Sequence, residues 1–417
     1  MGIHILVSTF KHRIMKIKNG IYSMLLLLVS ALAATAQRGL PPKETFTGSV
    51  GTNYAQHEDF QESMVSRITL PTGFKISVAA TGLGKPRMMA MLPDGGLYIS
   101  RRDAGDVLLL RDQDGDGKFE DLRTVHAKFP GVHGLAINNG YLYMCANREL
   151  KRARINGDGT LQRADTFVKN LPDGGQHPNR TIAFDKRGML YITVGSTCND
   201  CVESNAENAT ILQVAPNGAR RIYARGLRNT IGFDWHPQTG AMWGADHGTD
   251  WRGDDIPNDE LNLIKDSAHY GWPWVWMDRK IDLSREDPIG TTKDSFALKT
   301  EGMVLPFPAH SAPIGFSFLS KAFTFPADMQ DDVLVAMHGS WNRTQPDGFS
   351  IKRIRFENGQ PQAIEDFATG WYNKTSNSRF GRPCGLLVSP KGVVYVTDDA
   401  NGVLYAITPA TNSVTKK

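Results

Sequence analysis

The sequence predicts an all-β protein with the architecture of a six-bladed β-propeller. From Phe74 onward, a unit of two short apolar strands joined by a turn containing Pro, Asn, Asp or Gly recurs six times, and further strand follows. The copies read RMMAMLPDGGLYISRRDAGDVLLL, HGLAINNGYLYMCANRELKRARI, RTIAFDKRGMLYITVG, TIGFDWHPQTGAMWGADHG, FTFPADMQDDVLVAMHGSWN and CGLLVSPKGVVYVTDDANGVLYAI. Equivalent positions lie 45, 48, 52, 91 and 60 residues apart, at Leu97, Leu142, Leu190, Met242, Val333 and Val393. Repeats of about 40–50 residues with four short strands each are typical of propeller blades.

Two features of the repeat pattern concern the number of blades and the closure of the ring. The wide interval before Val333 holds an insertion or, alternatively, a hidden seventh blade. The early strand Phe74–Ala79 is expected to join the last copy, Cys384–Ile407, and to complete its sheet. Such closure leaves no long unpaired strand edge. We therefore expect residues 70–410 to form the propeller and residues 411–417 to form a C-terminal tail.

The first 36 residues have the pattern of a signal peptide. A basic start precedes the apolar run Ile21–Ala33, and Ala34-Thr35-Ala36 matches a small-residue cleavage site. An uncleaved anchor is the alternative. The run is short for a membrane span, and no later segment is long and apolar enough to be one. A periplasmic or secreted protein is expected, with residues 37–69 as a linker or an arm over the surface.

Composition and net charge indicate which kinds of binding partner to expect. The 41 glycines, 22 prolines and 41% hydrophobic residues describe a folded, turn-rich chain. The formal net charge of +4 is small for 417 residues, and no run of Lys or Arg dominates after the signal peptide. Nucleic-acid binding is therefore not expected.

The four cysteines divide into a close pair and two isolated residues. Cys198 and Cys201 form a C-x-x-C pair after a predicted strand, which favours a small disulfide that stiffens a loop. A second such pair is absent from the sequence, so a Cys-rich zinc site has little support. Cys145 and Cys384 lie in or beside apolar strand patterns and are expected to be packed thiols.

Chemically active residues concentrate at one end of the predicted strand pairs. Residues before each first strand and after each second strand emerge on the same face of a propeller, as they do around the hairpin Thr181–Phe184 and Met189–Val194. Before first strands stand His133, His177, Arg180, Arg228, Asn229, Arg379 and Arg382. After second strands stand Arg101, Arg102, the segment 196–201, the segment 246–248, the segment 338–343, Asp398 and Asp399. Several arginines suggest a planar polyanionic ligand, and histidine is a suitable general base. The alternative is that the arginines pair with Asp246, Asp398 and Asp399 in a solvated rim.

Several motifs together carry a family resemblance. GGQHPNRTIAF, VGSTCNDC, ARGLRNTIGFDWHPQTG, GDDIPNDELNLI followed by YGWP, HSAPIGF, HGSWNR and GRPCGLLVSP resemble the sorbosone dehydrogenase family. That family is similar to the soluble quinoprotein glucose dehydrogenases, which are six-bladed propellers that use pyrroloquinoline quinone (PQQ) and calcium. The resemblance covers residues 70–409, which is nearly all of the chain after the signal peptide.

The resemblance implies roles for individual residues. His177 matches the general base that takes the proton of the substrate hydroxyl while hydride passes to the quinone, and Arg228 with Asn229 matches the pair that hydrogen-bonds the reacting quinone oxygens. The further cofactor contacts it implies are His133, Arg343, Arg379 and Arg382. The active-site calcium is implied at Gly248, Thr249 and Asp259, where a hard cation would find oxygen ligands.

The chain departs from the glucose enzymes at two places. Ser196 stands where those enzymes have an aspartate that orients the catalytic histidine, and the calcium-loop region is longer by Asp250, Trp251, Asp254 and Asp255. Both differences argue against glucose as the substrate. Five tryptophans could stack on a sugar ring or pack in the core or in loops: Trp251, Trp272, Trp274, Trp276 and Trp341.

A separate acidic run stands in the outer part of the first copy. Asp112, Asp114, Asp116 and Asp121 alternate with Gly and Gln, and they predict either a structural calcium site or a metal-free turn. The glutamate that an EF-hand places twelfth is missing.

Three functions of different classes remain open. The first is a PQQ-dependent dehydrogenase of a sugar or alcohol that passes electrons to an external acceptor, a cytochrome or a quinone. The second is a calcium-dependent hydrolase of the lactonase kind, which would need carboxylate and Asn ligands on the axis. The third is a propeller that binds ligands without catalysis, an option that Ser196 keeps open.

Overall fold

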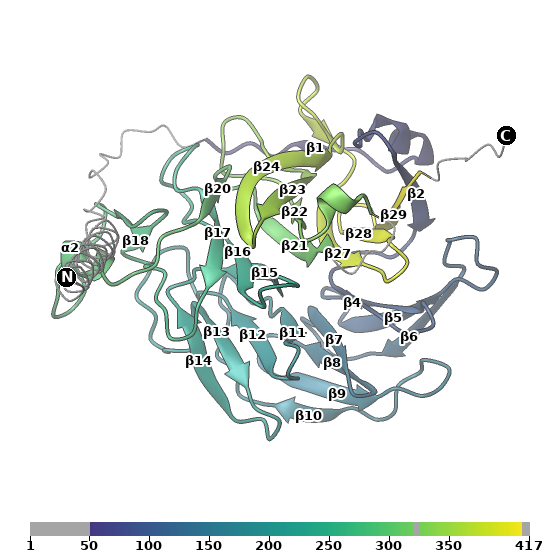
Figure 1. The fold of residues 1–417 in the computed structure, drawn as a ribbon, viewed down its shortest axis with the longest axis horizontal. Helices are drawn as coiled ribbons and strands as arrows, with labels where there is room; N and C mark the ends of the chain where they lie inside the picture. Colours follow the sequence, from purple (N-terminus) through teal and green to yellow (C-terminus); the bar gives the residue numbers. More distant parts are fainter. Residues whose placement is uncertain (1–50, 320–324, 411–417) are drawn as a thin grey trace, which may run out of the picture. The chain divides into compact units, whose positions relative to one another are not determined.

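The computed structural model describes residues 51–319 and 325–410 (Figure 1), which belong to one compact unit. The predicted signal peptide, the start of the arm and the predicted tail therefore lie outside the described residues. Among the described elements, strands predominate; the helical ones are α2 (Lys293–Ala297), η1 (Glu62–Arg67) and η3 (Ala327–Met329). The all-β class is confirmed. None of the described helices has the length and apolar character needed to cross a membrane.

Within residues 51–319 and 325–410, the strands form six four-stranded antiparallel sheets and two small ones. The first three are β3 (Met89–Met91), β4 (Leu97–Arg101), β5 (Asp106–Arg111) and β6 (Asp121–His126); β7 (Gly134–Asn138), β8 (Tyr141–Cys145), β9 (Leu150–Arg154) and β10 (Asp165–Val168); and β11 (Ile182–Phe184), β12 (Leu190–Val194), β13 (Thr210–Val214) and β14 (Arg220–Arg225). The next two are β15 (Thr230–Trp235), β16 (Met242–Asp246), β17 (Asp259–Ile264) and β20 (Leu305–Phe307); and β21 (Pro313–Phe318), β22 (Val333–Met337), β23 (Ser350–Glu357) and β24 (Gln360–Ala368).

The sixth sheet joins the two ends of the described chain. It contains β27 (Pro383–Val388), β28 (Val394–Asp398), β29 (Val403–Pro409) and β2 (Phe74–Ala80). β2 pairs with β29 from Phe74 opposite Pro409 to Ala80 opposite Leu404. The expected pairing of the early strand with the last copy is thus confirmed.

Successive sheets contact one another mostly through their first strands. β3 contacts β7, β7 contacts β11, β15 contacts β21, β21 contacts β27, and β27 contacts β3, while the third and fourth sheets meet through β12 and β15. These contacts join the sixth sheet back to the first. The backbones approach closely: a Cβ at Gly385 would lie 2.2 Å from the carbonyl oxygen of Arg87, and one at Gly315 would lie 2.5 Å from that of Cys384. Glycine at these two places lets the inner strands pack backbone to backbone. Apolar side chains then fill the space between the sheets, as Trp243, Phe307 and Phe318 do.

The interval before Val333 holds an insertion. Between β17 and β20 lie the hairpin of β18 (Val275–Trp276) with β19 (Lys280–Ile281) and the helix α2, whose N-cap Thr292 accepts a hydrogen bond from the backbone of Ser295. Within the described residues, this interval contributes no further four-stranded sheet.

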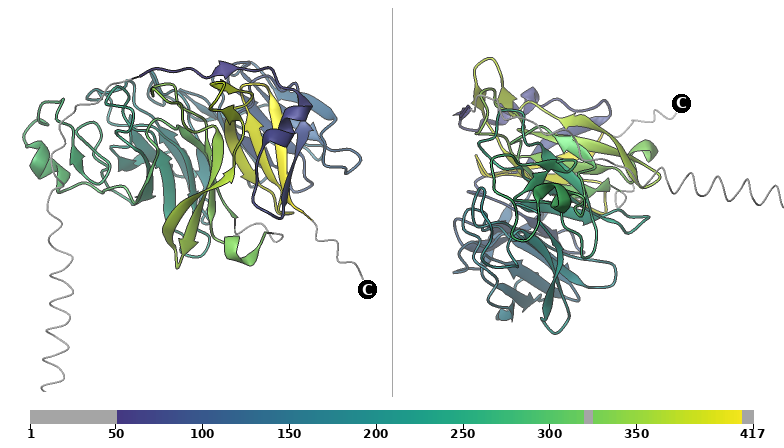
Figure 2. Two further views of the ribbon diagram at one scale, coloured as in Figure 1. Left: turned by 90° about the horizontal axis from the view of Figure 1, so that it is seen from above. Right: turned by 90° about the vertical axis from the view of Figure 1, so that its left-hand side faces the viewer.

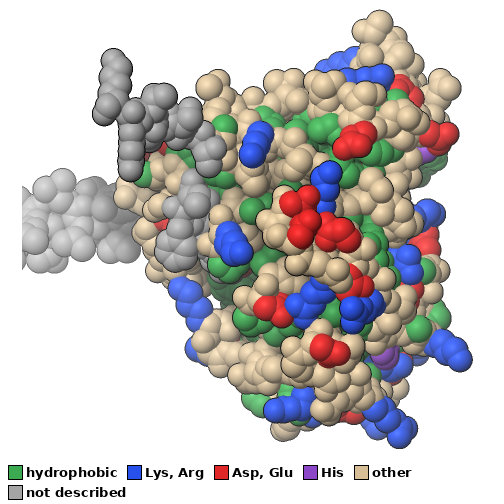
Figure 3. All heavy atoms as spheres, turned by 90° about the vertical axis from the view of Figure 1, so that its right-hand side faces the viewer, with side chains coloured by type: hydrophobic (Ala, Val, Ile, Leu, Met, Phe, Trp, Pro, Cys, Tyr) green, Lys and Arg blue, Asp and Glu red, His purple; other side chains and the backbone are tan. Residues whose placement is uncertain are grey.

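The arm runs over one side of the sheets (Figure 2). Its strand β1 (Gln56–His57) pairs with β26 (Ser378–Arg379), which pairs with β25 (Tyr372–Asn373) in a three-stranded sheet. The face in Figure 3 carries charged side chains of both signs, interspersed among neutral ones. This mixture agrees with the small net charge of the sequence.

Candidate functional site

The hairpin of β11 and β12 brings His177 beside Ser196. Its turn is held by Asp185, whose carboxylate accepts hydrogen bonds from the backbones of Arg187 and Met189. His177 precedes β11 and Ser196 follows β12, so both lie at the same end of the hairpin. The Nδ1 atom of His177 lies 2.9 Å from the Oγ atom of Ser196 and 2.9 Å from its carbonyl oxygen.

These contacts settle the proton position on the neutral ring of His177. A carbonyl oxygen only accepts, so the Nδ1 atom carries the proton and the Nε2 atom keeps its lone pair. Burial, followed by the charge of Arg228, lowers the pKa of His177 to about 3. The ring is therefore neutral near pH 7, with a proton acceptor at Nε2.

Arg180 holds the backbone around His177 through hydrogen bonds. The side chain is fully buried and donates to the carbonyl oxygens of His177 (3.0 Å) and Pro172 (3.0 Å) and to the Oδ1 atom of Asn147 (3.1 Å). Arg180 thus fixes the backbone of His177 and lines neither of the cavities described below.

The turn that carries Arg228 and Asn229 is held by a buried carboxylate. Asp246, at the end of β16, accepts hydrogen bonds from the backbone nitrogens of Arg228 (3.0 Å) and Asn229 (2.9 Å) and from the Oγ1 atom of Thr230 (2.7 Å). Burial outweighs these hydrogen bonds and raises the pKa of Asp246 to about 6. Asp246 therefore anchors the start of β15 and does not pair with an arginine in a solvated rim.

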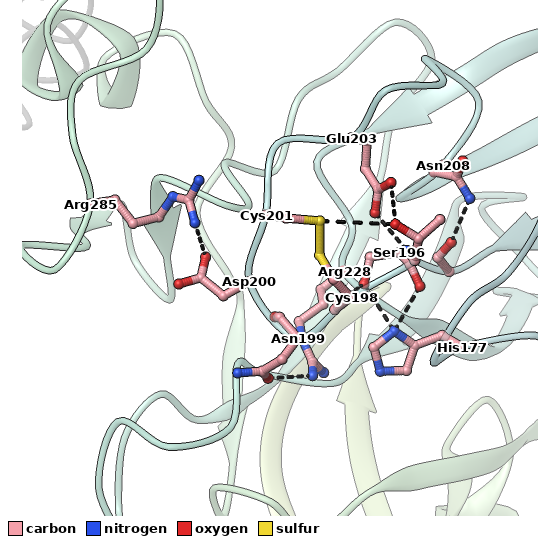
Figure 4. The surroundings of a disulfide bond; sticks show 12 residues. His177, Ser196, Cys198, Asn199, Asp200, Cys201, Glu203, Asn208, Arg228 and Arg285 are labelled. Atoms are coloured by element: carbon pink, nitrogen blue, oxygen red, sulfur yellow. Dashed lines mark hydrogen bonds and ion pairs between the residues drawn. A yellow bond between two sulfur atoms is a disulfide. The ribbon is translucent and has the colours of Figure 1, made fainter.

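The guanidinium of Arg228 is buried, with 3% of the residue exposed. Its Nε atom donates to the carbonyl oxygen of Asn199 at 2.9 Å, and its Nη2 atom donates to the Oδ1 atom of Asn199 at 2.8 Å and to the Oδ2 atom of Asp250 at 3.1 Å. His177 and Arg228 both lie against the loop that contains the Cys198–Cys201 disulfide (Figure 4). The expected disulfide is present, and Cys145 and Cys384 are buried thiols, as predicted.

His177 and Arg228 line one cavity of about 380 Å³. Its lining consists of Gln176, His177, Asn199, Arg228, His247, Gly248, Asp250, Trp251, Asp259, His310, Ala312 and Trp341. Trp251 and Trp341 pack edge to face with ring centroids 5.2 Å apart, and Tyr54 of the arm stacks on Trp341 at 6.2 Å. Aromatic rings therefore border a cavity that contains a base and a guanidinium.

A second cavity of about 630 Å³ adjoins the first and shares Gln176, His247, Ala312 and Trp341 with it. Its charged lining residues are Lys85, Arg87, Arg102, Arg379 and Arg382 against Asp103 and Asp399. Five cationic groups face two carboxylates, so three positive charges are left unbalanced. Asn229 also lines this cavity, and its Nδ2 atom lies 3.3 Å from the Nδ1 atom of His247.

The arginines of the second cavity are held in place from behind. Arg382 donates to the carbonyl oxygens of His338 (3.0 Å) and Gly339 (2.9 Å), and burial lowers its pKa to about 10, so it stays cationic. Arg87 pairs with Asp399, which also accepts a hydrogen bond from the Nε2 atom of His338 at 2.8 Å. Burial lowers the pKa of His338 to about 3, so His338 donates as a neutral ring.

Two of the predicted cofactor residues lie outside these cavities. The guanidinium of Arg343 bonds to the carbonyl oxygens of Asp254 and Ala309 and to the carboxylate of Asp255, so it is turned toward the loop after Gly248. His133, directly before β7, is fully buried, and burial lowers its pKa well below the usual value. The structure thus places Arg379 and Arg382 in the cavity lining, but not Arg343 and His133.

The predicted calcium residues surround one loop. Gly248 and Asp259 line the first cavity, and Thr249 is buried beside them. The Oδ1 atom of Asp259 accepts from the backbone of Gly248 at 2.9 Å, and its Oδ2 atom accepts from the backbone of Ala312 at 2.8 Å. Asp259 therefore closes this loop, and the other carboxylate in the same cavity belongs to Asp250, which the sequence prediction did not select as a ligand.

The acidic run of the first sheet forms a separate, mostly exposed group. The carboxylates of Asp112, Asp114 and Asp116 lie close to that of Glu120 and accept hydrogen bonds from the backbone of their own loop. Asp121, which the sequence prediction included, instead pairs with Arg123. These contacts are those of a self-capped turn.

Sequence reasoning missed Lys85, Arg87, Asp250 and His310. Arg87 could have been found, because it precedes the first strand of the first copy just as Arg180, Arg228 and Arg382 precede theirs. Asp250 and His310 lie in loops outside the strands that define the repeat. The Nδ1 atom of His310 lies 3.3 Å from the Oδ1 atom of Asp250.

The chain is similar to known proteins over most of its length. Residues 68–410 match the family model described as TrAA12-like. A pyrroloquinoline quinone-dependent sugar dehydrogenase of Hypocrea jecorina is 23% identical over 399 residues, which cover 80% of this chain and 88% of that one. The calcium structure of the Trichoderma reesei carbohydrate-active enzyme of family AA12 is 22% identical, with a TM-score of 0.69 over 82% of this chain and 97% of that one. The holo form of the pyranose dehydrogenase PQQ domain of Coprinopsis cinerea is 20% identical, with the same TM-score and the same coverage.

The two structural likenesses show a shared fold, and the family model spans most of the chain. The resemblance that the sequence motifs indicated is confirmed at the level of the family. The chain belongs to the TrAA12-like family.

Proposed function

We propose that this protein is a dehydrogenase that uses PQQ to oxidise a sugar or a related alcohol, with His177 as the general base. The observation that carries the proposal is the junction of two cavities. One contains a neutral imidazole with an available Nε2 lone pair beside a buried guanidinium, and the other has three unbalanced positive charges. The named activity of the Hypocrea jecorina relative supports the same chemistry.

The second cavity fits PQQ, which is flat and carries three carboxylates. Its three excess positive charges would balance such a ligand, and guanidinium groups bind carboxylates in paired hydrogen bonds. The Nη1 atom of Arg379 and the Nε atom of Arg87 are buried without a hydrogen-bond partner, so each has a donor to give. Arg87, Arg379 and Arg382 would hold the carboxylates.

The residues where the two cavities meet would act on the reacting end. His177 would accept the hydroxyl proton of the substrate at Nε2, while Ser196 keeps the Nδ1–H in place. Arg228 and Asn229 would donate hydrogen bonds where negative charge develops, since both are already fixed by Asp246. When bound, PQQ would accept hydride and calcium would polarise it.

Calcium would be held near the loop that begins at Gly248. The backbone of Gly248 and the carboxylates of Asp250 and Asp259 would offer oxygen atoms, as a hard cation requires, and all three residues line the first cavity. The Trichoderma reesei relative is known in a calcium structure, which supports calcium as the ion. Thr249 would contribute through its backbone.

We extend the proposal to the architecture of the chain and to its cellular location. We take the six four-stranded sheets as six propeller blades, closed by β2 on β29, with the two small sheets in the connections. We take residues 1–36 as a signal peptide, so that the protein would act in the periplasm or outside the cell.

The two competing functions have less support from the geometry. Cationic groups outnumber carboxylates in the second cavity, whereas a calcium-dependent lactonase needs converging carboxylates. Ser196, which had kept a non-catalytic propeller open, makes the hydrogen bond to His177 that an orienting residue must make.

The test is reconstitution. Purified protein is incubated with PQQ and calcium, and the reduction of a redox dye is followed with a panel of sugars and alcohols. Dye reduction that needs both PQQ and substrate is expected. Lactone hydrolysis without PQQ would support the hydrolase instead, and quinone binding without turnover would support a binding module.

A further inference from the structure

The loop closed by the disulfide between Cys198 and Cys201 is connected to His177 through Ser196 (Figure 4). The Oγ atom of Ser196 donates to the carbonyl oxygen of Cys198 at 2.7 Å. A hydroxyl has one proton, so its lone pairs are then free to accept from the Nδ1 atom of His177 at 2.9 Å. The position of Cys198 therefore sets the direction of the hydrogen bond to the base.

Asn199 connects the same loop to Arg228. Its carbonyl oxygen and its Oδ1 atom both accept hydrogen bonds from the guanidinium, at 2.9 and 2.8 Å. The Oδ1 atom also accepts from the backbone nitrogen of Asp250 at 2.9 Å, and the Nδ2 atom donates to the carbonyl oxygen of Asp250 at 3.1 Å. One side chain thus joins the disulfide loop, the turn of Arg228 and the loop after Gly248.

The disulfide loop is itself tied to its surroundings. Asp200 forms ion pairs with Arg252 and Arg285, and the carboxylate of Glu203 accepts from the backbone nitrogen (2.6 Å) and the hydroxyl (2.8 Å) of Thr197. A guanidinium on a long side chain loses rotamer freedom when it is ordered, and a supporting shell of hydrogen bonds supplies that order before the ligand arrives.

We propose that the disulfide loop is the positioning element of this site. Asn199 orients the guanidinium of Arg228, and Cys198 orients the imidazole of His177 through Ser196. None of the three supporting residues needs to touch a reacting atom. The inference rests on the proposed function for the reaction that is affected, but the orientation of both groups can be measured on the protein alone.

The test combines nuclear magnetic resonance without added quinone and kinetics with it. In Asn199→Ala, an Nη2 proton of Arg228 is expected to exchange with water at least about tenfold faster, because its side-chain acceptor, the Oδ1 atom of Asn199, is lost. Turnover with PQQ is expected to fall about 10- to 100-fold, since a misplacement of about 1 Å can cost that much. Asn199→Asp, which keeps an acceptor oxygen, should recover a large part of both.

The double variant Cys198→Ser/Cys201→Ser tests the disulfide itself. It is expected to change the imidazole nitrogen signals of His177 and the exchange of the Arg228 proton, together with turnover. Asn217→Ala, in the exposed turn between β13 and β14, is the matched control and should change neither.

Two outcomes separate the inference from the proposed function. If both variants lower the melting temperature but leave the two signals and turnover unchanged, the loop is only a structural staple and the inference is overturned. If the wild-type protein shows no turnover with PQQ, the proposed function fails, while the Arg228 and His177 signals still decide whether the loop positions them.

Discussion

The Nδ1 atom of His177 lies equally close, at 2.9 Å, to the hydroxyl and to the carbonyl oxygen of Ser196. The ring is therefore oriented by two neutral acceptors. A carboxylate at this position would stabilise the imidazolium and raise the pKa of His177. With serine there, burial and the charge of Arg228 outweigh the hydrogen bond to Ser196 and the charge of Asp250, and the pKa of His177 is lowered to about 3. Ser196 thus orients His177 while the imidazole stays neutral.

His177→Ala is expected to abolish turnover with PQQ and to leave the binding of the quinone largely intact. The variant removes the proton acceptor of the first cavity, whereas the cationic groups of the second cavity remain. Steady-state kinetics and a quinone titration by fluorescence would measure the two effects. His126→Ala, on the outer strand β6, is the control. Residual activity with lost binding would remove His177 from the role of base.

Arg228→Ala is expected to reduce transition-state stabilisation by about 2.7–4 kcal/mol, as the removal of one oxyanion donor does. This corresponds to a fall of about 100- to 1,000-fold in kcat. The same variant leaves Asp250 without its arginine partner, so its folding must be checked by circular dichroism. An unchanged kcat in a folded variant would contradict the role of Arg228.

The strands, the disulfide and much of the site could be predicted because they depend on local patterns. The hairpin of β11 and β12 begins within one residue of its predicted strands, and the repeat placed His177, Arg228 and Arg382 on one face. The direction in which a long side chain points does not follow from such local patterns. Arg343 follows β22 as expected, but the oxygen atoms of Asp254, Asp255 and Ala309 draw its guanidinium away from the cavity.

Local contacts that a sequence does not show also explain where several aspartates lie. Asp246 and Asp398, which the alternative interpretation of the arginines placed in a solvated rim, are buried and accept backbone hydrogen bonds at the starts of β15 and β27. A sequence shows that a carboxylate follows a strand, but not whether a neighbouring turn presents its N–H groups to that carboxylate. The same holds for Asp259, which closes the loop at Gly248.

Arg382 and Arg343 make a matched pair for testing the second cavity. Arg382→Ala is expected to weaken quinone binding about 10- to 100-fold, because a hydrogen bond to a charged group contributes about 1.5–3 kcal/mol. Arg343→Ala is expected to leave the affinity nearly unchanged, since its guanidinium lies outside the cavity. Isothermal titration calorimetry at fixed ionic strength would measure both. Equal losses would show that Arg343 also reaches the ligand.

Acid is expected to destabilise the fold through His269, which lies in the insertion before β18. Its Nδ1 atom accepts a hydrogen bond from the backbone of Gly271 at 3.0 Å, and its ring packs edge to face on Phe296. Burial, followed by the charge of Arg225, lowers the pKa of His269 to about 4. The ring is therefore neutral in the folded protein at pH values where the unfolded chain already binds a proton.

The sign of the effect follows from proton binding. Between pH 6.5 and 4 the unfolded state binds more protons at this site, so the free energy of unfolding falls as the pH falls. Denaturant unfolding of the wild type and of His269→Gln at pH 7, 6, 5 and 4 would measure the difference. Relative to the variant, the wild type should lose up to about 3 kcal/mol across this range, at 1.36 kcal/mol for each pKa unit. Parallel curves for the two proteins would mean that His269 titrates alike in the folded and unfolded states.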